Sequence, residues 1–176
     1  GARGIHIVRD PRDMLLSAVR FHLKATELWL DEPNAEWGGQ TFREKLMGYA
    51  RIEDQVAFEM DTHMGWTIER MAGFDLQGVF VNVRYEDLIV DHQMTRFHDV
   101  LVHLGLRGRE LINGLEAYWS SSLFGERCEH DKQATANHVF DSTARQWEKG
   151  LSRSCIERIE SRFGDAIEKL GYPLGS

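Results

Sequence analysis

The chain has 176 residues, of which 42% are hydrophobic and 28% are charged, values typical of a globular protein long enough to bury a core in one domain. Its formal net charge of −7 argues against a general nucleic-acid binder, and no stretch is apolar enough to span a membrane. Only two cysteines occur, too few for a disulfide framework, so we expect a cytoplasmic protein.

The first half of the chain predicts one strand and several helices. A short buried strand is expected at residues 5–8. Asp10 and Pro11 then form a typical helix start, and the helix is expected to reach about Trp29. Residues 31–40 form a loop, after which Thr41 begins a long amphipathic helical region reaching about Met71, with or without a break near Arg51.

The second half predicts a second strand at 79–84 and helices at about 93–104, 108–121 and 153–170. Residues 124–139 show no period and are expected to form a loop. The apolar character of both strands favours a parallel sheet that is buried on both faces. Because two parallel strands make a poor sheet alone, we predict an incomplete α/β fold, rich in helix with a small parallel sheet, in a single domain over residues 1–176.

The stretch GIHIVRDPRDMLLSAVRFH, residues 4–22, joins the first strand to the first helix. Backbone N–H groups at a helix start favour an anion, and the planar fork of Arg9 suits a phosphate. Ser17 lies close to two helical turns after the cap, on roughly the same side of the helix, and can offer a hydroxyl to the same anion. The alternative is that Arg9 and Arg12 make surface salt bridges with acidic neighbours, namely Asp10, Asp13 or Glu86.

Three segments in this order, RDPRDMLLSAVRFH, VRYEDLIVD and STARQWEKGLS with FGDAIEKLGYP after it, resemble the cytosolic-type and bacterial sulfotransferases. These enzymes use 3′-phosphoadenosine 5′-phosphosulfate (PAPS) and have a P-loop-NTPase-like fold. The resemblance implies that Arg9 and Ser17 bind the 3′-phosphate of the cofactor and that Tyr85 lies near its adenine. It also implies sulfuryl transfer to a hydroxyl or amine of a small molecule or glycan.

The third segment departs from the family pattern. By the resemblance, Trp147 matches the tryptophan of a loop that closes over the 3′-phosphate, and three polar residues of that loop are candidate phosphate contacts: Ser142, Thr143 and Arg145. Ala144 stands where a glycine is usual, and the basic Arg-Lys-Gly run is absent. The alternatives are that Trp147 packs in the core and that Arg145 is a solvated charge.

In the resembling enzymes, a phosphosulfate-binding P-loop and the catalytic histidine precede the RDPRD segment. No GxxxxGK[ST] loop occurs in the 176 residues, so no catalytic residue is assigned. Three explanations stay open: a fragment, which we favour, a chain complemented by another polypeptide, or a natural short relative. The unpaired strand edge predicts a complementing N-terminal segment or self-association.

Two other function classes are weighed against the enzyme. One is a non-catalytic nucleotide-binding or protein-interaction module derived from the same fold. The other is a nucleotide or sugar kinase relative, which the three segments disfavour.

Further residues are weighed for an acceptor pocket or a metal. Trp29 and Trp37 flank a glycine-containing loop and are expected to line an acceptor pocket or simply to pack. His22 is expected to pack or to line that pocket, and His63 to be structural. The loop residues Cys128, His130 and Asp131 lack a fourth ligand at a spacing typical of zinc sites, so we expect no bound metal.

Overall fold

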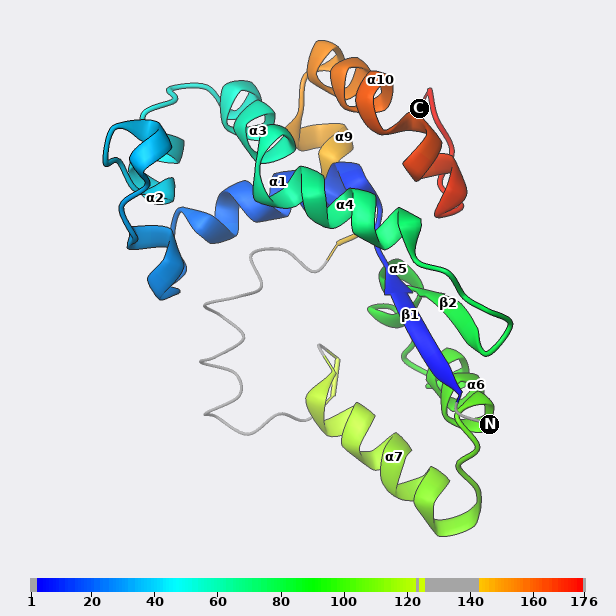
Figure 1. Cartoon of the computed structure of the whole chain (residues 1–176). Coiled ribbons are helices and arrows are strands. Elements are labelled where there is room, and N and C mark those ends of the chain that lie inside the picture. The colour runs from blue at the N-terminus through cyan, green and yellow to red at the C-terminus, as the bar shows by residue number, and fades with distance from the viewer. Residues whose placement is uncertain (1–2, 123, 126–142, 176) are drawn as a thin grey trace. The chain divides into compact units, whose positions relative to one another are not determined.

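The computed structural model describes residues 3–122, 124–125 and 143–175 (Figure 1). It is a helix-rich α/β structure with a small parallel sheet of two strands. The contacts divide the chain into two compact units: unit 1 is Gly1–Arg9 with Phe74–Ala144, and unit 2 is Asp10–Gly73 with Arg145–Ser176. The expectation of a single domain stays a prediction.

Unit 1 holds the sheet, whose strands β1 (Gly4–Val8) and β2 (Phe80–Arg84) pair in parallel from Gly4↔Phe80 to Val8↔Arg84. Among the described residues, its helices are α5 (Tyr85–Leu88), α6 (Thr95–His103) and α7 (Gly108–Ser121). Both predicted strands and the helix predicted at 108–121 are therefore confirmed. The predicted loop at 124–139 falls almost wholly outside the described residues.

Both faces of the sheet carry exposed residues. On one face, the Phe74 ring stacks on His6 at 4.6 Å between centroids and meets Phe80 edge-on at 5.1 Å. The register places Ile7 and Val81 on the other face, where they are 51% and 37% exposed. The prediction of burial on both faces is therefore wrong for the described residues, because no described layer fully covers the face that carries Ile7 and Val81.

Unit 2 is helical, and its first helix is α1 (Pro11–His22), which packs against α3 (Ile52–Asp61), α4 (His63–Gly73), α9 (Trp147–Gly150) and α10 (Arg153–Lys169) (Figure 1). Short 3-10 turns η1 (Leu28–Asp31) and η2 (Ala35–Trp37) and the helix α2 (Phe42–Met47) complete the unit. Gly171, with a φ of +86°, follows α10, as predicted for its stop. No helix of the described residues has both the length and the apolar run that crossing a membrane requires.

The first helix ends at His22, so the prediction that it reaches Trp29 is wrong. The guanidinium of Arg43 donates to the carbonyl oxygens of His22 at 2.8 Å and Ala25 at 2.5 Å. It also pairs with Asp31 at 2.7 Å, which holds the returning chain against the helix end. Arg43 lies about 20 residues after the carbonyl groups that it satisfies at the helix end. The local sequence pattern therefore does not indicate where this helix ends.

The long helical region predicted from Thr41 is three helices. Thr41 does begin it, in a capping box in which the Glu44 backbone N–H donates to Thr41 Oγ1 at 3.1 Å and Glu44 Oε2 accepts from the Thr41 N–H at 2.9 Å. The chain breaks before α3, near Arg51 as predicted, and again at Thr62. Gly65 permits the second break, since a Cβ there would lie 1.9 Å from the Met60 carbonyl oxygen.

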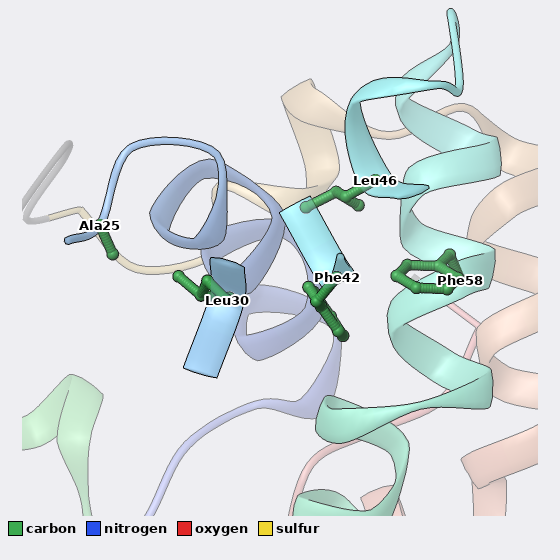
Figure 2. Packing of buried hydrophobic residues seen from close by; sticks show 5 residues of the cluster. All are labelled: Ala25, Leu30, Phe42, Leu46 and Phe58. Atoms are coloured by element: carbon green, nitrogen blue, oxygen red, sulfur yellow. The ribbon is translucent and has the colours of Figure 1, made fainter. Parts of the chain in front are cut away.

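A compact apolar cluster fills the space between the end of α1, η1, α2 and α3. Figure 2 shows the Phe42 ring pointing toward Phe58, with 4.9 Å between their centroids. The cluster contains Ala25, Leu30, Phe42, Leu46 and Phe58. Burying a Leu or Phe side chain contributes about 1.5–3 kcal/mol, so this cluster is a major source of stability for unit 2.

A buried guanidinium joins α1 to the C-terminal part of unit 2. Arg12 is 1% exposed and donates to both carboxylate oxygens of Asp10 at 3.0 and 2.8 Å, to Glu160 at 2.6 Å and to the Pro173 carbonyl at 3.0 Å. Its Cζ atom lies 3.9 Å from the centroid of a Trp147 ring. Arg12 does form a salt bridge with Asp10, but the expectation that this salt bridge lies on the surface is wrong.

The charge of Arg12 is secured by its partners. Burial acts to lower the pKa of Arg12, but the hydrogen bonds and charges of Asp10 and Glu160 outweigh it and raise the pKa above its ordinary value. Arg12 therefore stays charged, and the buried Asp10 carboxylate depends on that positive charge for its stability.

We expect Arg12→Met to lower the free energy of unfolding by about 3–5 kcal/mol, because it leaves the Asp10 carboxylate buried without its cation. Urea denaturation measures this loss. Arg153→Met is the control, since Arg153 pairs with Glu157 across an exposed helix turn and contributes only about 0.3–0.5 kcal/mol. Equal losses in the two variants would contradict the role of Arg12. Adding Asp10→Asn should recover part of the Arg12→Met loss.

Candidate functional site

The carboxyl ends of the two parallel strands bring Arg9 and Tyr85 together. Val8 pairs with Arg84. Arg9 directly follows Val8, and Tyr85 directly follows Arg84. The Arg9 Cζ atom lies 4.7 Å from the centroid of the Tyr85 ring, and both side chains are half-buried. Ligands of α/β sheets bind beyond the carboxyl ends of strands, so this is the edge where a nucleotide is expected.

The helix start that follows Arg9 has the predicted cap. The Asp10 carboxylate accepts from the backbone N–H of Arg12 at 2.9 Å, and Pro11 occupies the first helical position. Ser17 lies half-buried on α1. Arg9 belongs to unit 1 and Ser17 to unit 2, so their joint binding of one phosphate stays a prediction.

The third predicted segment is held to α1 by its backbone. Asp13, which is 2% exposed, accepts hydrogen bonds from the backbone N–H groups of Arg145 at 2.8 Å and Trp147 at 3.0 Å. Trp147 is buried under Arg12, whereas the Arg145 side chain is exposed and pairs with Glu148. These environments agree with the alternative interpretations, in which Trp147 packs in the core and Arg145 is a solvated charge.

The structure says little about Ser142 and Thr143, the other two candidate phosphate contacts of that segment. Thr143 is exposed, and Ser142 lies outside the described residues. Contacts of this segment with a phosphate therefore stay a prediction.

A concave site lies in unit 2, between the short turns and the start of α4. This aromatic pocket has a volume of about 450 Å³, within the range of small-molecule sites. Its lining includes Trp29, Glu32, Trp37, Phe42, Thr62 and His63. The sequence pointed to Trp29 and Trp37, but it did not indicate His63, which the break at Thr62 brings to the pocket.

Two histidines and a buried carboxylate lie at this pocket. His22 Nδ1 and Glu59 Oε1 are 2.6 Å apart, and both residues are almost fully buried. The His22 ring lies 5.5 Å from His63 and 5.3 Å from Phe42, both of which line the pocket. His22 thus packs behind the pocket wall, in agreement with its expected packing role.

His63 is exposed but loses part of its hydration to its neighbours. Desolvation lowers the pKa of His63 below its ordinary value, and the nearby charge of His22 lowers it further, whereas Glu59 and Glu27 act in the opposite direction. The lowered pKa favours the neutral imidazole, which can accept a proton or a hydrogen bond.

No group of three potential metal ligands occurs within residues 3–122, 124–125 and 143–175. The loop residues Cys128, His130 and Asp131 lie outside this range.

Comparison with protein-family models, with curated proteins and with solved structures gave no match. The function is therefore inferred from the residues and their geometry.

We expect the NMR titration midpoint of the His63 ring to lie below 6.5, its ordinary value. At His63 the unfolded chain then binds more protons than the folded chain does, so the contribution of this group to the free energy of unfolding should decrease as pH falls below about 6.5. In His22→Gln the midpoint should rise, because one lowering charge is removed. A wild-type midpoint at or above 6.5 would contradict this account of the pocket.

Proposed function

We propose that the chain is part of a PAPS-dependent sulfotransferase and carries the half-site for the 3′-phosphate and adenine of the nucleotide. Arg9 and Ser17 bind the 3′-phosphate, and Tyr85 contacts the adenine. The complete enzyme moves a sulfuryl group from PAPS to a hydroxyl or amine of a small molecule or glycan, on an incomplete P-loop-NTPase-like sheet. By the resemblance, Ser142, Thr143, Arg145 and Trp147 belong to a loop that closes over the 3′-phosphate, and their contacts with a phosphate stay a prediction.

One observation carries the proposal: Arg9 and Tyr85 meet at the carboxyl edge of the parallel strands. They are far apart in the sequence and come from two separate segments that resemble the sulfotransferases. A guanidinium supplies charge-assisted hydrogen bonds to a phosphate, and an aromatic ring supplies a surface for a purine. Arg9 and Tyr85 contact each other at the strand edge where open α/β sheets bind ligands of this kind.

The two halves of the proposal have separate chemical signatures. A phosphate contact by Arg9 depends on the ligand having a 3′-phosphate, whereas a purine contact by Tyr85 does not. A pair of ligands that differ only in this group, 3′,5′-adenosine bisphosphate and 5′-AMP, therefore separates the two roles.

We expect calorimetry to show micromolar binding of 3′,5′-adenosine bisphosphate, which Arg9→Ala weakens by about 1.5–3 kcal/mol, the usual value for a charged hydrogen bond. Binding of 5′-AMP should be weaker and nearly insensitive to Arg9→Ala. Ser17→Ala should cost about 0.5–1.5 kcal/mol. Tyr85→Phe keeps the ring and should bind normally, whereas Tyr85→Leu should weaken both ligands.

Arg109→Ala is the matched control, because it removes one exposed positive charge from the same unit. If Arg109→Ala weakens binding as much as Arg9→Ala does, the effect is general electrostatics and no 3′-phosphate site exists at Arg9. Failure of the folded wild-type chain to bind the bisphosphate also contradicts the half-site.

The exposed face of the sheet favours one further candidate, a protein-interaction module. Ile7 and Val81 are β-branched, lie on the same face and are 51% and 37% exposed. Apolar surface of this kind, on a sheet whose outer edges have no partner strand among the described residues, favours association with another chain or with a second copy. A complementing strand-bearing segment and a homo-oligomer are the two forms of this candidate.

If the sheet associates with a second copy, sedimentation equilibrium should give an average mass above 20.3 kDa that increases with concentration. Val81→Lys should return the mass to 20.3 kDa, since it places a charge on the exposed face. Val90→Lys, at a 62% exposed valine outside the strands, should have no effect. A monomeric wild-type chain at all concentrations would leave only the complementing segment.

A further inference from the structure

The aromatic pocket of unit 2 has walls set at steep angles to one another. The Trp29 and Phe42 rings are 5.1 Å apart with 68° between their planes, and Trp37 and Phe42 are 6.0 Å apart at 58°. A flat ligand stacks best on parallel ring faces, whereas a rounded group is contacted well by rings that face it from different directions. The arrangement of the walls therefore favours a compact, rounded group over a planar one.

The charge of the lining favours a cation. Glu32 lies in the pocket wall, and among the described lining residues there is no lysine or arginine to oppose a positive ligand. Desolvation and His22 lower the pKa of His63, the remaining titratable group of the lining, which favours its neutral form. The pocket thus presents one negative charge and several aromatic faces.

A neighbouring carboxylate strengthens this preference at Trp29. The indole Nε1–H of Trp29 donates to Glu27 Oε2 at 2.6 Å. A carboxylate that accepts this bond increases the negative potential on the ring face, which is the surface that attracts cations. Trp29 is stacked on the His63 ring at 5.0 Å, which holds it in the wall of the pocket.

We propose that this pocket binds a small organic cation bearing an alkylated ammonium group, with the ammonium against Trp29, Trp37 and Phe42 and facing Glu32. Alkylated ammonium groups are compact, carry a diffuse positive charge and are weakly hydrated, so aromatic walls with a nearby carboxylate replace water at low cost. The site lies wholly in unit 2 and does not depend on the proposed nucleotide half-site.

The experiment compares choline with 3,3-dimethyl-1-butanol, which has nearly the same shape and no charge. Calorimetry on the full chain at pH 7.5 should give a Kd for choline of about 1 mM or tighter, as expected of a small ligand in a preformed pocket. The neutral analogue should bind at least about fivefold more weakly. Equal affinity of the two compounds, or no binding of choline, overturns the proposal.

Matched variants locate the site. Glu32→Gln and Trp37→Leu should each weaken choline binding severalfold, and circular dichroism checks that both variants fold. Glu36→Gln removes an adjacent exposed carboxylate, and Trp66→Leu removes an exposed tryptophan of α4; neither residue lines the pocket, and neither change should matter. Choline binding that Glu32→Gln and Trp37→Leu leave unchanged, or that the control variants weaken equally, overturns the proposal.

The same variants separate this site from the nucleotide half-site. Glu32→Gln should leave binding of 3′,5′-adenosine bisphosphate unchanged, and Arg9→Ala should leave binding of choline unchanged. A variant that loses binding of one ligand should therefore keep binding of the other.

Discussion

The Arg12 guanidinium is the interaction on which the arrangement of unit 2 depends. It lies at the beginning of α1, with Asp10 beside it, Glu160 of α10 and the Pro173 carbonyl beyond it, and the Trp147 ring in contact. A charge buried this deeply is costly unless all its donors are used, so these partners are held in place together. The neighbouring Asp13 adds a second connection, through the backbone N–H groups of Arg145 and Trp147.

This constraint separates the two arginines of the RDPRD segment by role. Arg12 is buried in unit 2, where its guanidinium donates hydrogen bonds to protein groups. Arg9 is half-buried at the end of β1, beside Tyr85. In the proposed half-site, therefore, only Arg9 is placed to meet a nucleotide, and Arg12 serves the framework on which the following helix stands.

The aromatic pocket is built from short turns that other side chains hold in place. Arg43 joins the end of α1 to Asp31, and its hydrogen bond is the main reason that the pKa of Asp31 lies below its ordinary value. Trp29 is thereby kept near Phe42, while the helix break at Thr62 brings His63 to the same space. The proposed ligand pocket is thus built from irregular segments, which the Arg43 guanidinium and the apolar cluster hold together.

Local chemistry was sufficient for much of the secondary structure. The strands, the Asp10 cap, the helix start at Thr41 and the stop after α10 are all predicted by neighbouring residues, because caps and periodicity act over a few positions. The sequence also indicated Arg9 and Tyr85, and the parallel register brings them together. Phosphate binding by Ser17 and by the 142–147 segment stays a prediction.

Only the tertiary structure decided where α1 ends, that Arg12 is buried and that His63 reaches the pocket. Each of these depends on a contact between residues distant in the sequence, such as Arg43 with His22 or Arg12 with Glu160. By itself the sequence determined the types of elements and the candidate chemistry at their ends. Long-range hydrogen bonds and packing selected which of those groups face the interior and which remain available to a ligand, because burial is a property of the assembled fold.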